Sequence, residues 1–304
     1  MARIELLDPD LGGIDAEQRA EALSLAAAMP RLVVAARRAA QTVVHGLHGR
    51  RRAGTGENFW QFRRFSAGEA RTRIDWRRSA RDEHLYVREQ EWEAAHTIWI
   101  WIDRSQSMAY RSSLAQSSKL ERAVTLGLAL ADILVRGGER VGLLGLTRPT
   151  SSRNAVDRLA EALCVAPPDA NGLPAATAPI ARLSEAVLIS DLLAPSEDVA
   201  ATVADLAARG GRGHLVSIAD PVEETFPFSG RTEFRDPDGA FRLTAGRAED
   251  YRADYERRLA RHRAEVTEAA RRRGWSSLLH RTDRPATEAL LALHTRLAEV
   301  DSAA

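Results

Sequence analysis

From residue 97 onward, short apolar runs alternate with longer segments whose apolar residues recur at helical spacing. The short runs predict strands at residues 98–102, 140–146, 186–190, 214–219 and 275–280. The longer segments predict helices at residues 119–136, 155–164, 199–209, about 248–273, and 287–300. Strands that alternate with helices are typical of βαβ units. The pattern therefore predicts an α/β fold with a doubly wound, mostly parallel sheet.

The chain before residue 96 has a different pattern. Residues 16–48 are rich in Ala and Leu and predict a helix that Pro30 divides in two. Aromatic residues in 59–65 and apolar residues at 85–87 predict two short strands. We therefore expect residues 1–95 to form an N-terminal helical and β extension and residues 96–304 to form the α/β domain.

One segment interrupts the alternation inside the expected α/β domain. In residues 226–244, two apolar stretches flank the sequence Asp-Pro-Asp-Gly at 236–239. Asp-Gly between two such stretches is a strong signal for a tight turn. The segment is thus predicted to be a hairpin insertion.

A polar run directly follows the most apolar strand. Residues 98–102 read Ile-Trp-Ile-Trp-Ile, and Asp103, Ser105 and Ser107 come next at alternate positions. Ligands of open α/β sheets bind beyond the carboxyl ends of the strands. One carboxylate and two hydroxyls are hard oxygen donors, which suit Mg²⁺, Mn²⁺ or Ca²⁺. The alternative is that these residues only cap a helix.

Asp191 is the best candidate for a further ligand. It follows the predicted strand 186–190, so it can face Asp103 across the crevice. Here too the alternative is a cap for the next helix.

Two motifs resemble those of known families. The run Asp-Arg-Ser-Gln-Ser-Met at 103–108 resembles the metal-ion-dependent adhesion site of von Willebrand factor A-like domains. The run GEARTRIDWRRSAR at 68–81 resembles the signature G-D-x-x-R-x-I-D-W-x-x-S-A-R of the DUF58 family. The resemblance extends more weakly from about His45 to the C-terminus, including residues 220–224 and 274–275.

The resemblance implies a sheet of von Willebrand factor A type and a specific set of ligands. Asp103, Ser105, Ser107 and Asp191 would hold the ion, and a carboxylate from a protein partner would complete its shell. The family also places a threonine between the two strands. Thr177 lies in that interval, although its flanking sequence departs from the pattern, and Thr147 fits less well. The implied partner is a MoxR-type AAA+ ATPase, in systems that mature or assemble other proteins.

The arginine-rich run 71–81 surrounds Asp75 and Trp76. One interpretation is a surface for an acidic partner or a nucleotide. The interpretation that we favour is structural: Arg73 or Arg81 pairs with Asp75, and Trp76 lies in the core. Acidic residues interleave with the basic ones, and no nucleic-acid-binding motif accompanies them, so nucleic acid is not the expected partner.

Composition adds few constraints. The chain has 304 residues, 44% of them hydrophobic, and a net charge of +1, so charge neither requires nor excludes an anionic partner. Its basic residues are nearly all arginine, and Lys119 is the lone lysine. No signal peptide and no apolar stretch of about 20 residues is visible, so we expect a cytoplasmic protein without a membrane span.

The candidate chemistry favours binding over catalysis. The sequence has no G-x-S-x-G motif, and Ser105 stands where a haloacid-dehalogenase type of phosphotransferase would need a second aspartate. An ion held by one carboxylate and two hydroxyls stays electrophilic enough to capture an external Asp or Glu. The sequence therefore predicts a metal-dependent protein–protein interaction module, most simply with Mg²⁺. The alternatives are a metal-dependent hydrolase or phosphotransfer enzyme and a metal-free scaffold.

Overall fold

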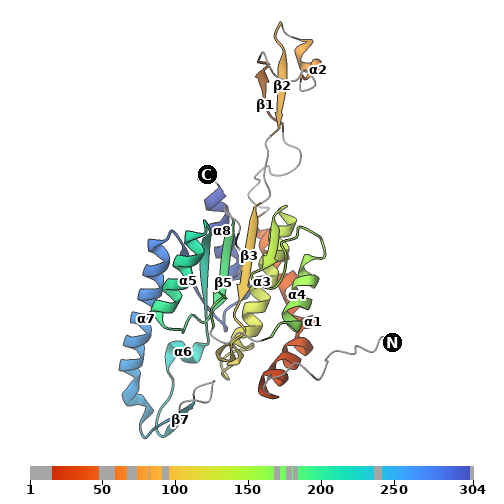
Figure 1. Ribbon diagram of the computed structural model, residues 1–304. Helices are drawn as coiled ribbons and strands as arrows, with labels where there is room; N and C mark the ends of the chain where they lie inside the picture. Colours follow the sequence, from red (N-terminus) through yellow and green to blue (C-terminus); the bar gives the residue numbers. More distant parts are fainter. Residues whose placement is uncertain are drawn as a thin grey trace, which may run out of the picture. The chain divides into compact units, whose positions relative to one another are not determined.

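A computed structural model describes residues 16–47, 59–66, 74–81, 83–90, 96–167, 172–175, 180, 184–235 and 242–301 (Figure 1). The chain divides into two compact units. We call the first the α/β unit, formed by residues 1–47 together with 96–304, and the second the small unit, formed by residues 48–95. Each is described by itself.

The α/β unit is built on a sheet of five parallel strands in the described chain. Across the sheet the order is β4 (Arg140–Leu143), β3 (Thr97–Ile102), β5 (Glu185–Ser190), β6 (Arg212–Ala219) and β9 (Ser276–Arg281). The predicted α/β fold with a doubly wound, mostly parallel sheet is confirmed. β4 ends three residues earlier than predicted, because the chain turns and pairs Thr150 antiparallel with Val141.

Helices cover both faces of this sheet (Figure 1). One face carries α3 (Lys119–Arg136), α4 (Ala155–Val165) and α8 (Ala286–Asp301). The other carries α5 (Ser196–Ala208) and α7 (Arg252–Arg272). No helix in the described ranges is both long enough and apolar enough to cross a lipid bilayer.

The alternating side chains of β3 explain how one strand serves both layers. Ile98, Ile100 and Ile102 are buried in the core beneath α3, while Trp99 and Trp101 are buried in the core beneath α5 and α7. Successive residues of a strand point to opposite faces, so an unbroken apolar run is what a strand covered on both sides requires.

The helix α1 (Ala16–Leu47) corrects two predictions. It is one helix that contains Pro30, not two helices divided there. Pro30 is exposed, so the carbonyl group that loses its hydrogen bond lies on the solvent side. Leu25, Met29, Leu32 and Ala36 form a buried stripe on both sides of the proline, and this packing holds the helix together.

The helix α1 also belongs to the α/β unit, not to a separate extension ending at residue 95. It packs against α3, α4 and α8. The reason lies in α3, whose residues 123–131 are buried on every side of the helix. A helix that is apolar all round must be covered on its outer face as well as against the sheet.

The predicted insertion is a hairpin formed by β7 (Thr232–Arg235) and β8 (Arg242–Ala245), which pair antiparallel. It follows a short helix that was not predicted, α6 (Pro221–Thr225), and precedes a 3₁₀ turn, η3 (Ala248–Tyr251). An aromatic cluster includes one residue of the hairpin; it consists of Phe226, Phe228, Phe234 and Tyr255. The hairpin and α7 are therefore joined by aromatic contacts.

The small unit contains β1 (Phe59–Arg64) and β2 (Tyr86–Gln90), which pair antiparallel, and the single-turn helix α2 (Trp76–Ser79). The predicted place of Trp76 in the core is wrong, and Arg73, one of the two predicted partners of Asp75, lies outside the described residues. Asp75 caps α2 by accepting a hydrogen bond from the backbone N–H of Arg78 at 2.9 Å, and Trp76 is 61% exposed. Among the described residues of this unit, the buried apolar side chains are Ile74 and Val87.

Candidate functional site

The order of the strands determines where the site lies. β3 is the first strand of the sheet along the chain, and it lies between the second, β4, and the third, β5. The connection that leaves β3 runs to α3 on one face of the sheet, and the connection that leaves β5 runs to α5 on the other face, which creates a crevice at the carboxyl ends of the two strands. Ile102 is paired with Ile189, and the next backbone N–H, that of Asp103, donates to the carbonyl of Ile189 at 2.9 Å. The backbones of Asp103 and Asp191 therefore follow two neighbouring strands at the same edge of the sheet.

Asp103 is completely buried, with 0% of its surface exposed. One carboxylate oxygen accepts a hydrogen bond from the backbone N–H of Ser105 at 2.8 Å, and the other accepts one from the hydroxyl of Ser190 at 2.7 Å. Burial raises the pKa of Asp103 above its usual range, although the bonds from Ser190 and Ser105 lower it. Both of these donors are uncharged, so a nearby cation would stabilise the ionised carboxylate.

The two serines of the motif bring their hydroxyls together. Ser105 precedes the 3₁₀ helix η2 (Gln106–Ala109), but its side chain makes no cap hydrogen bond there. Instead its Oγ lies 3.2 Å from the Oγ of Ser107, and Ser107 donates to Asp191 Oδ2 at 2.7 Å. The capping alternative does not describe these hydroxyls.

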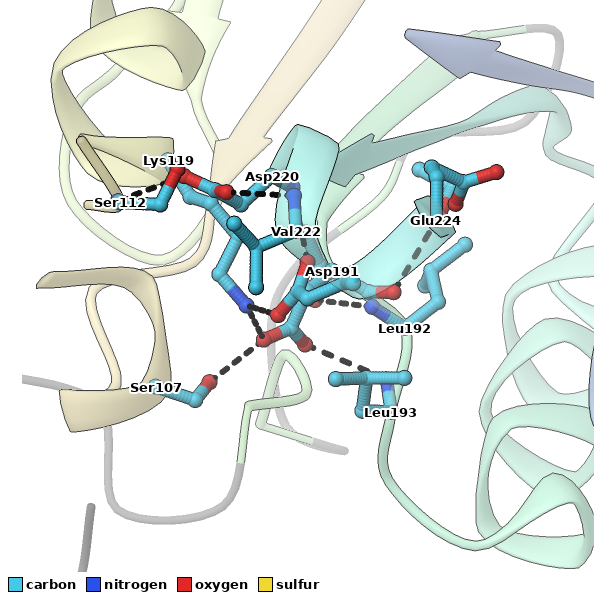
Figure 2. Close-up of polar contacts among 12 residues, drawn as sticks. Ser107, Ser112, Lys119, Asp191, Leu192, Leu193, Asp220, Val222 and Glu224 are labelled. Carbon is cyan, nitrogen blue, oxygen red and sulfur yellow. Dashed lines mark hydrogen bonds and ion pairs between the residues drawn. The ribbon is translucent and has the colours of Figure 1, made fainter. Parts of the chain in front are cut away.

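Asp191 is not a helix cap either. The N-cap of α5 is Pro195, and Asp191 Oδ1 accepts from the backbone N–H of Leu193 at 3.2 Å within the loop before it. Its second oxygen, Oδ2, faces Ser107 (Figure 2). The structure thus brings Asp103, Ser105, Ser107 and Asp191 into one connected network.

The sequence analysis missed Lys119 as a member of this site. Its Nζ donates to Asp191 Oδ2 at 2.9 Å and to Glu223 Oε1 at 2.7 Å, and the residue is only 1% exposed (Figure 2). Burial acts to lower the pKa of Lys119, but the two carboxylates outweigh burial and raise it above its ordinary value. The ammonium therefore stays charged at neutral pH. A signal was present in the sequence, because this is the lone lysine of a chain that otherwise uses arginine.

Glu223 comes from α6, which a capping box fixes in place. Asp220 Oδ1 accepts from the backbone N–H of Val222 at 2.9 Å, and Glu223 Oε2 accepts from the backbone N–H of Asp220 at 2.8 Å. The other oxygen of Asp220 accepts from the backbone N–H of Ser112 at 2.9 Å (Figure 2). The acidic run 220–224 thus ties the end of β6 to the loop before α3.

Gly172 lies against the two residues that begin the motif. It has a φ of +62°, and a Cβ there would lie 3.4 Å from Asp103 Oδ2 and 3.7 Å from Ser105 Oγ. A larger residue would therefore be strained by this φ, while its Cβ would make ordinary van der Waals contact with the candidate ligands. Thr177, the predicted threonine ligand, lies outside the described residues.

The site opens into a cavity of about 1410 Å³. Ser105, Ser107, Lys119 and Asp191 form part of its wall, and the aromatic cluster of the hairpin forms another part. The cavity thus joins a polar end, where the strands stop, to an apolar end beside α7. A volume of this size exceeds that of most small-molecule pockets.

The residues present suit a hard divalent ion. Carboxylate and hydroxyl oxygens are the donors that Mg²⁺ and Mn²⁺ prefer, and they converge from two loops. In the described ranges of the chain, no group of three or more His, Cys, Asp or Glu side chains is placed to hold a metal. An ion at this site would therefore depend on the serine hydroxyls and on water.

Comparison with known proteins identifies relatives of the chain. The sequence model of a family described as "Protein of unknown function DUF58" matches residues 61–265. Uncharacterized proteins of Mycobacterium tuberculosis and Mycobacterium bovis are 27% identical over 277 residues, which cover 86% of this chain and 86% of each relative.

Solved structures with a lower similarity come from two Bacteroides species. A conserved hypothetical protein BatB from Bacteroides thetaiotaomicron is 16% identical with a TM-score of 0.40. An aerotolerance-related membrane protein from Bacteroides fragilis is 16% identical with a TM-score of 0.41. Each match covers 67% of this chain and 100% of the other.

Proposed function

The chain belongs to the DUF58 family, and from this premise we propose that it is a metal-dependent protein–protein interaction module with a site of the von Willebrand factor A type. Asp103, Ser105, Ser107 and Asp191 are the proposed ligands, directly or through water. Mg²⁺ is the proposed ion, and an acidic side chain of the partner completes its shell.

One observation carries the proposal. The hydroxyls of Ser105 and Ser107, 3.2 Å apart, lie between the carboxylates that follow β3 and β5. Four oxygen-bearing side chains thus converge at the crevice where the sheet connections diverge, which is where open α/β sheets bind ligands. The carboxylate of Asp103 is buried against uncharged donors, an arrangement that a cation would stabilise.

The charge of the donor set supports binding of a carboxylate. Two carboxylates balance the charge of a divalent ion, and the ammonium of Lys119, which also pairs with Glu223, lies beside them. When bound, Mg²⁺ supplies a Lewis-acid centre that can accept an acidic side chain. The surrounding residues of this chain then fix the direction from which that side chain arrives.

The cavity beside the site supports a protein as the partner. It extends from Ser107 and Asp191 to the aromatic cluster, so a segment that places a carboxylate at one end can bury apolar side chains at the other. A MoxR-type AAA+ ATPase is the partner that we propose, on the resemblance of the family motifs alone. Neither the contacts nor the cavity identifies it.

The experiment is a titration of the full chain with Mg²⁺ and Mn²⁺, alone and with a purified MoxR-type ATPase from the same genome. We expect ion-dependent binding of the ATPase that EDTA removes and that Asp103→Asn abolishes. Asp132→Asn is the matched control. It also removes one negative charge, but from a position on α3 that lies about 20 Å along the helix from Lys119. Binding of the ATPase that persists in EDTA and in a folded Asp103→Asn protein would overturn the proposal.

The competing enzyme is distinguished in the same experiment. Generic phosphoester substrates are added with Mg²⁺, and turnover is followed for the wild type and for Asp103→Asn. Turnover that depends on Asp103 would favour a metal-dependent hydrolase over an interaction module. A folded protein that binds neither ion nor ATPase would leave the metal-free scaffold.

A further inference from the structure

Lys119 has a position that neither the motif nor the family resemblance accounts for. It is the first residue of α3, and its side chain reaches back into the network at the carboxyl ends of β3 and β5. Only 2% of the side chain is exposed, compared with 5% for Asp191 and 21% for Glu223. A fixed ammonium thus occupies a place beside the proposed ion.

The ammonium and the proposed ion compete for the same oxygen. Asp191 Oδ2 accepts hydrogen bonds both from Lys119 Nζ at 2.9 Å and from Ser107 Oγ at 2.7 Å. The other oxygen of Asp191 accepts from the backbone N–H of Leu193. The carboxylate that should strengthen an ion site is therefore already neutralised by a cation of the chain itself.

Glu223 holds Lys119 in this place. Its Oε1 accepts from Lys119 Nζ at 2.7 Å, while its Oε2 is fixed by the backbone N–H of Asp220. The carbonyl of Glu223 also accepts from the hydroxyl of Tyr255 at 2.9 Å. The lysine is thus anchored between α6 and the end of β5, and it cannot swing away without breaking two ion pairs.

We propose that Lys119 is a built-in cation that lowers the affinity of the site for a free divalent ion, so that the ion and a partner carboxylate bind together. The inference rests on the function proposed above and names how that site is regulated. Like charges a few ångströms apart repel even at a protein surface, and an incoming carboxylate offsets this repulsion. By linkage, ion and carboxylate must then raise each other's affinity by the same factor.

A purely structural role makes a different prediction. If Lys119 only joins α6 to β5, its replacement changes stability and leaves ion affinity unaltered. Loss of one partner from a buried pair also leaves an uncompensated charge, which destabilises proteins strongly. The test therefore replaces lysine and glutamate together, in Lys119→Gln/Glu223→Gln, so that the net charge is unchanged and Asp191 alone loses its ion pair.

The measurement is direct Mn²⁺ binding, followed by the electron paramagnetic resonance signal of the free ion. We expect the double variant to bind Mn²⁺ about tenfold or more tightly than the wild type, because Asp191 Oδ2 no longer holds an ammonium and can bind the ion. Asp132→Asn/Arg136→Gln is the matched control: it removes an ion pair from the same helix, about 20 Å or more from Lys119, and should leave the affinity unchanged. Unchanged or weaker Mn²⁺ binding by the folded double variant would overturn the inference.

A second measurement needs no variant. Acetate serves as the probe for a partner carboxylate, and we expect it to increase the Mn²⁺ affinity of the wild-type chain severalfold. The absence of any effect of acetate would also contradict the inference. If the wild type and the double variant bind no Mn²⁺ with or without acetate, the proposed function fails together with the inference. If both bind it equally well, only the inference fails.

Discussion

Two groups of ionisable side chains lie at the carboxyl ends of strands in the same sheet. The first is the candidate site, after β3 and β5. The second lies after β9, where Arg122 donates to the carbonyls of Thr282 and Arg284, both at 2.8 Å, and His280 is buried nearby. Both groups involve the first turn of α3, which carries Lys119 and Arg122.

The difference between them is what each cation binds. Arg122 binds backbone carbonyls, which hold a turn in place. Lys119 binds two carboxylates, one of which also contacts a serine hydroxyl on the wall of a cavity. A cation at the end of a strand therefore does not by itself mark a binding site: Arg122 fixes a turn, whereas Lys119 lies beside side-chain oxygens that line a cavity.

The largest expected effect is on stability in the second group. Arg122→Met keeps the apolar length of the side chain but removes both hydrogen bonds to the turn after β9. We expect the free energy of unfolding to fall by about 3 kcal/mol, since bonds from charged donors are worth about 1.5–3 kcal/mol each. Urea denaturation measures this, with the exposed Arg136→Met as the control. Mn²⁺ binding should be unchanged. Loss of Mn²⁺ binding in folded Arg122→Met would contradict a purely structural role of Arg122.

The next effect depends on pH. Burial, together with the positive charge of Arg122, lowers the pKa of His280 to about 4. Below its ordinary pKa of about 6.5, the unfolded chain therefore takes up a proton that the folded chain does not. Stability from this group is present at neutral pH and is lost as the pH falls from about 6.5 towards 4.

Denaturation of the wild type and of His280→Gln at pH 7 and pH 5 measures this contribution. We expect the wild type to lose about 2 kcal/mol more than the variant over this interval. His294, whose pKa burial also lowers, is kept in both proteins, so its contribution cancels. Equal losses in the two proteins would show that His280 does not carry the pH dependence.

The smallest expected effect is in the first group. Asp103→Asn removes a buried charge that accepts hydrogen bonds only from uncharged donors at Ser105 and Ser190. We expect its free energy of unfolding to stay the same or rise by about 1 kcal/mol, as is common where a residue is kept for function at the expense of stability. Thermal unfolding without divalent ions is the measurement. A loss of several kcal/mol would instead assign Asp103 a structural role like that of Arg122.

The sequence predicted what local pattern and the geometry of parallel strands determine. Asp103 and Asp191 could be placed together because the ends of adjacent parallel strands meet at one edge of the sheet. Lys119 could not, because its two partners lie 72 and 104 residues away and contact it only after α3 and α6 are packed. Its isolation among arginines was visible, but that isolation identified neither of its two partners.

The errors in the N-terminal region have a related cause. Pro30 indicates a break when only the local backbone is considered, but a buried stripe of side chains on both sides of it outweighs the lost hydrogen bond. Trp76 looks like a core residue by type, yet it lies on a helix of one turn and is exposed. The burial of α3 on every side was the overlooked signal, since its apolar sequence already required a covering helix.

That covering helix has a consequence for how the protein is made. On the ribosome, α1 is synthesised before any strand of the sheet, and α8, which it contacts, after all of them. The apolar face of α1 that packs on α3, α4 and α8 is therefore without its final neighbours while the small unit and the sheet emerge. We expect the nascent chain to need shielding of α1 during this interval, and completion of the core to coincide with release of the last helix.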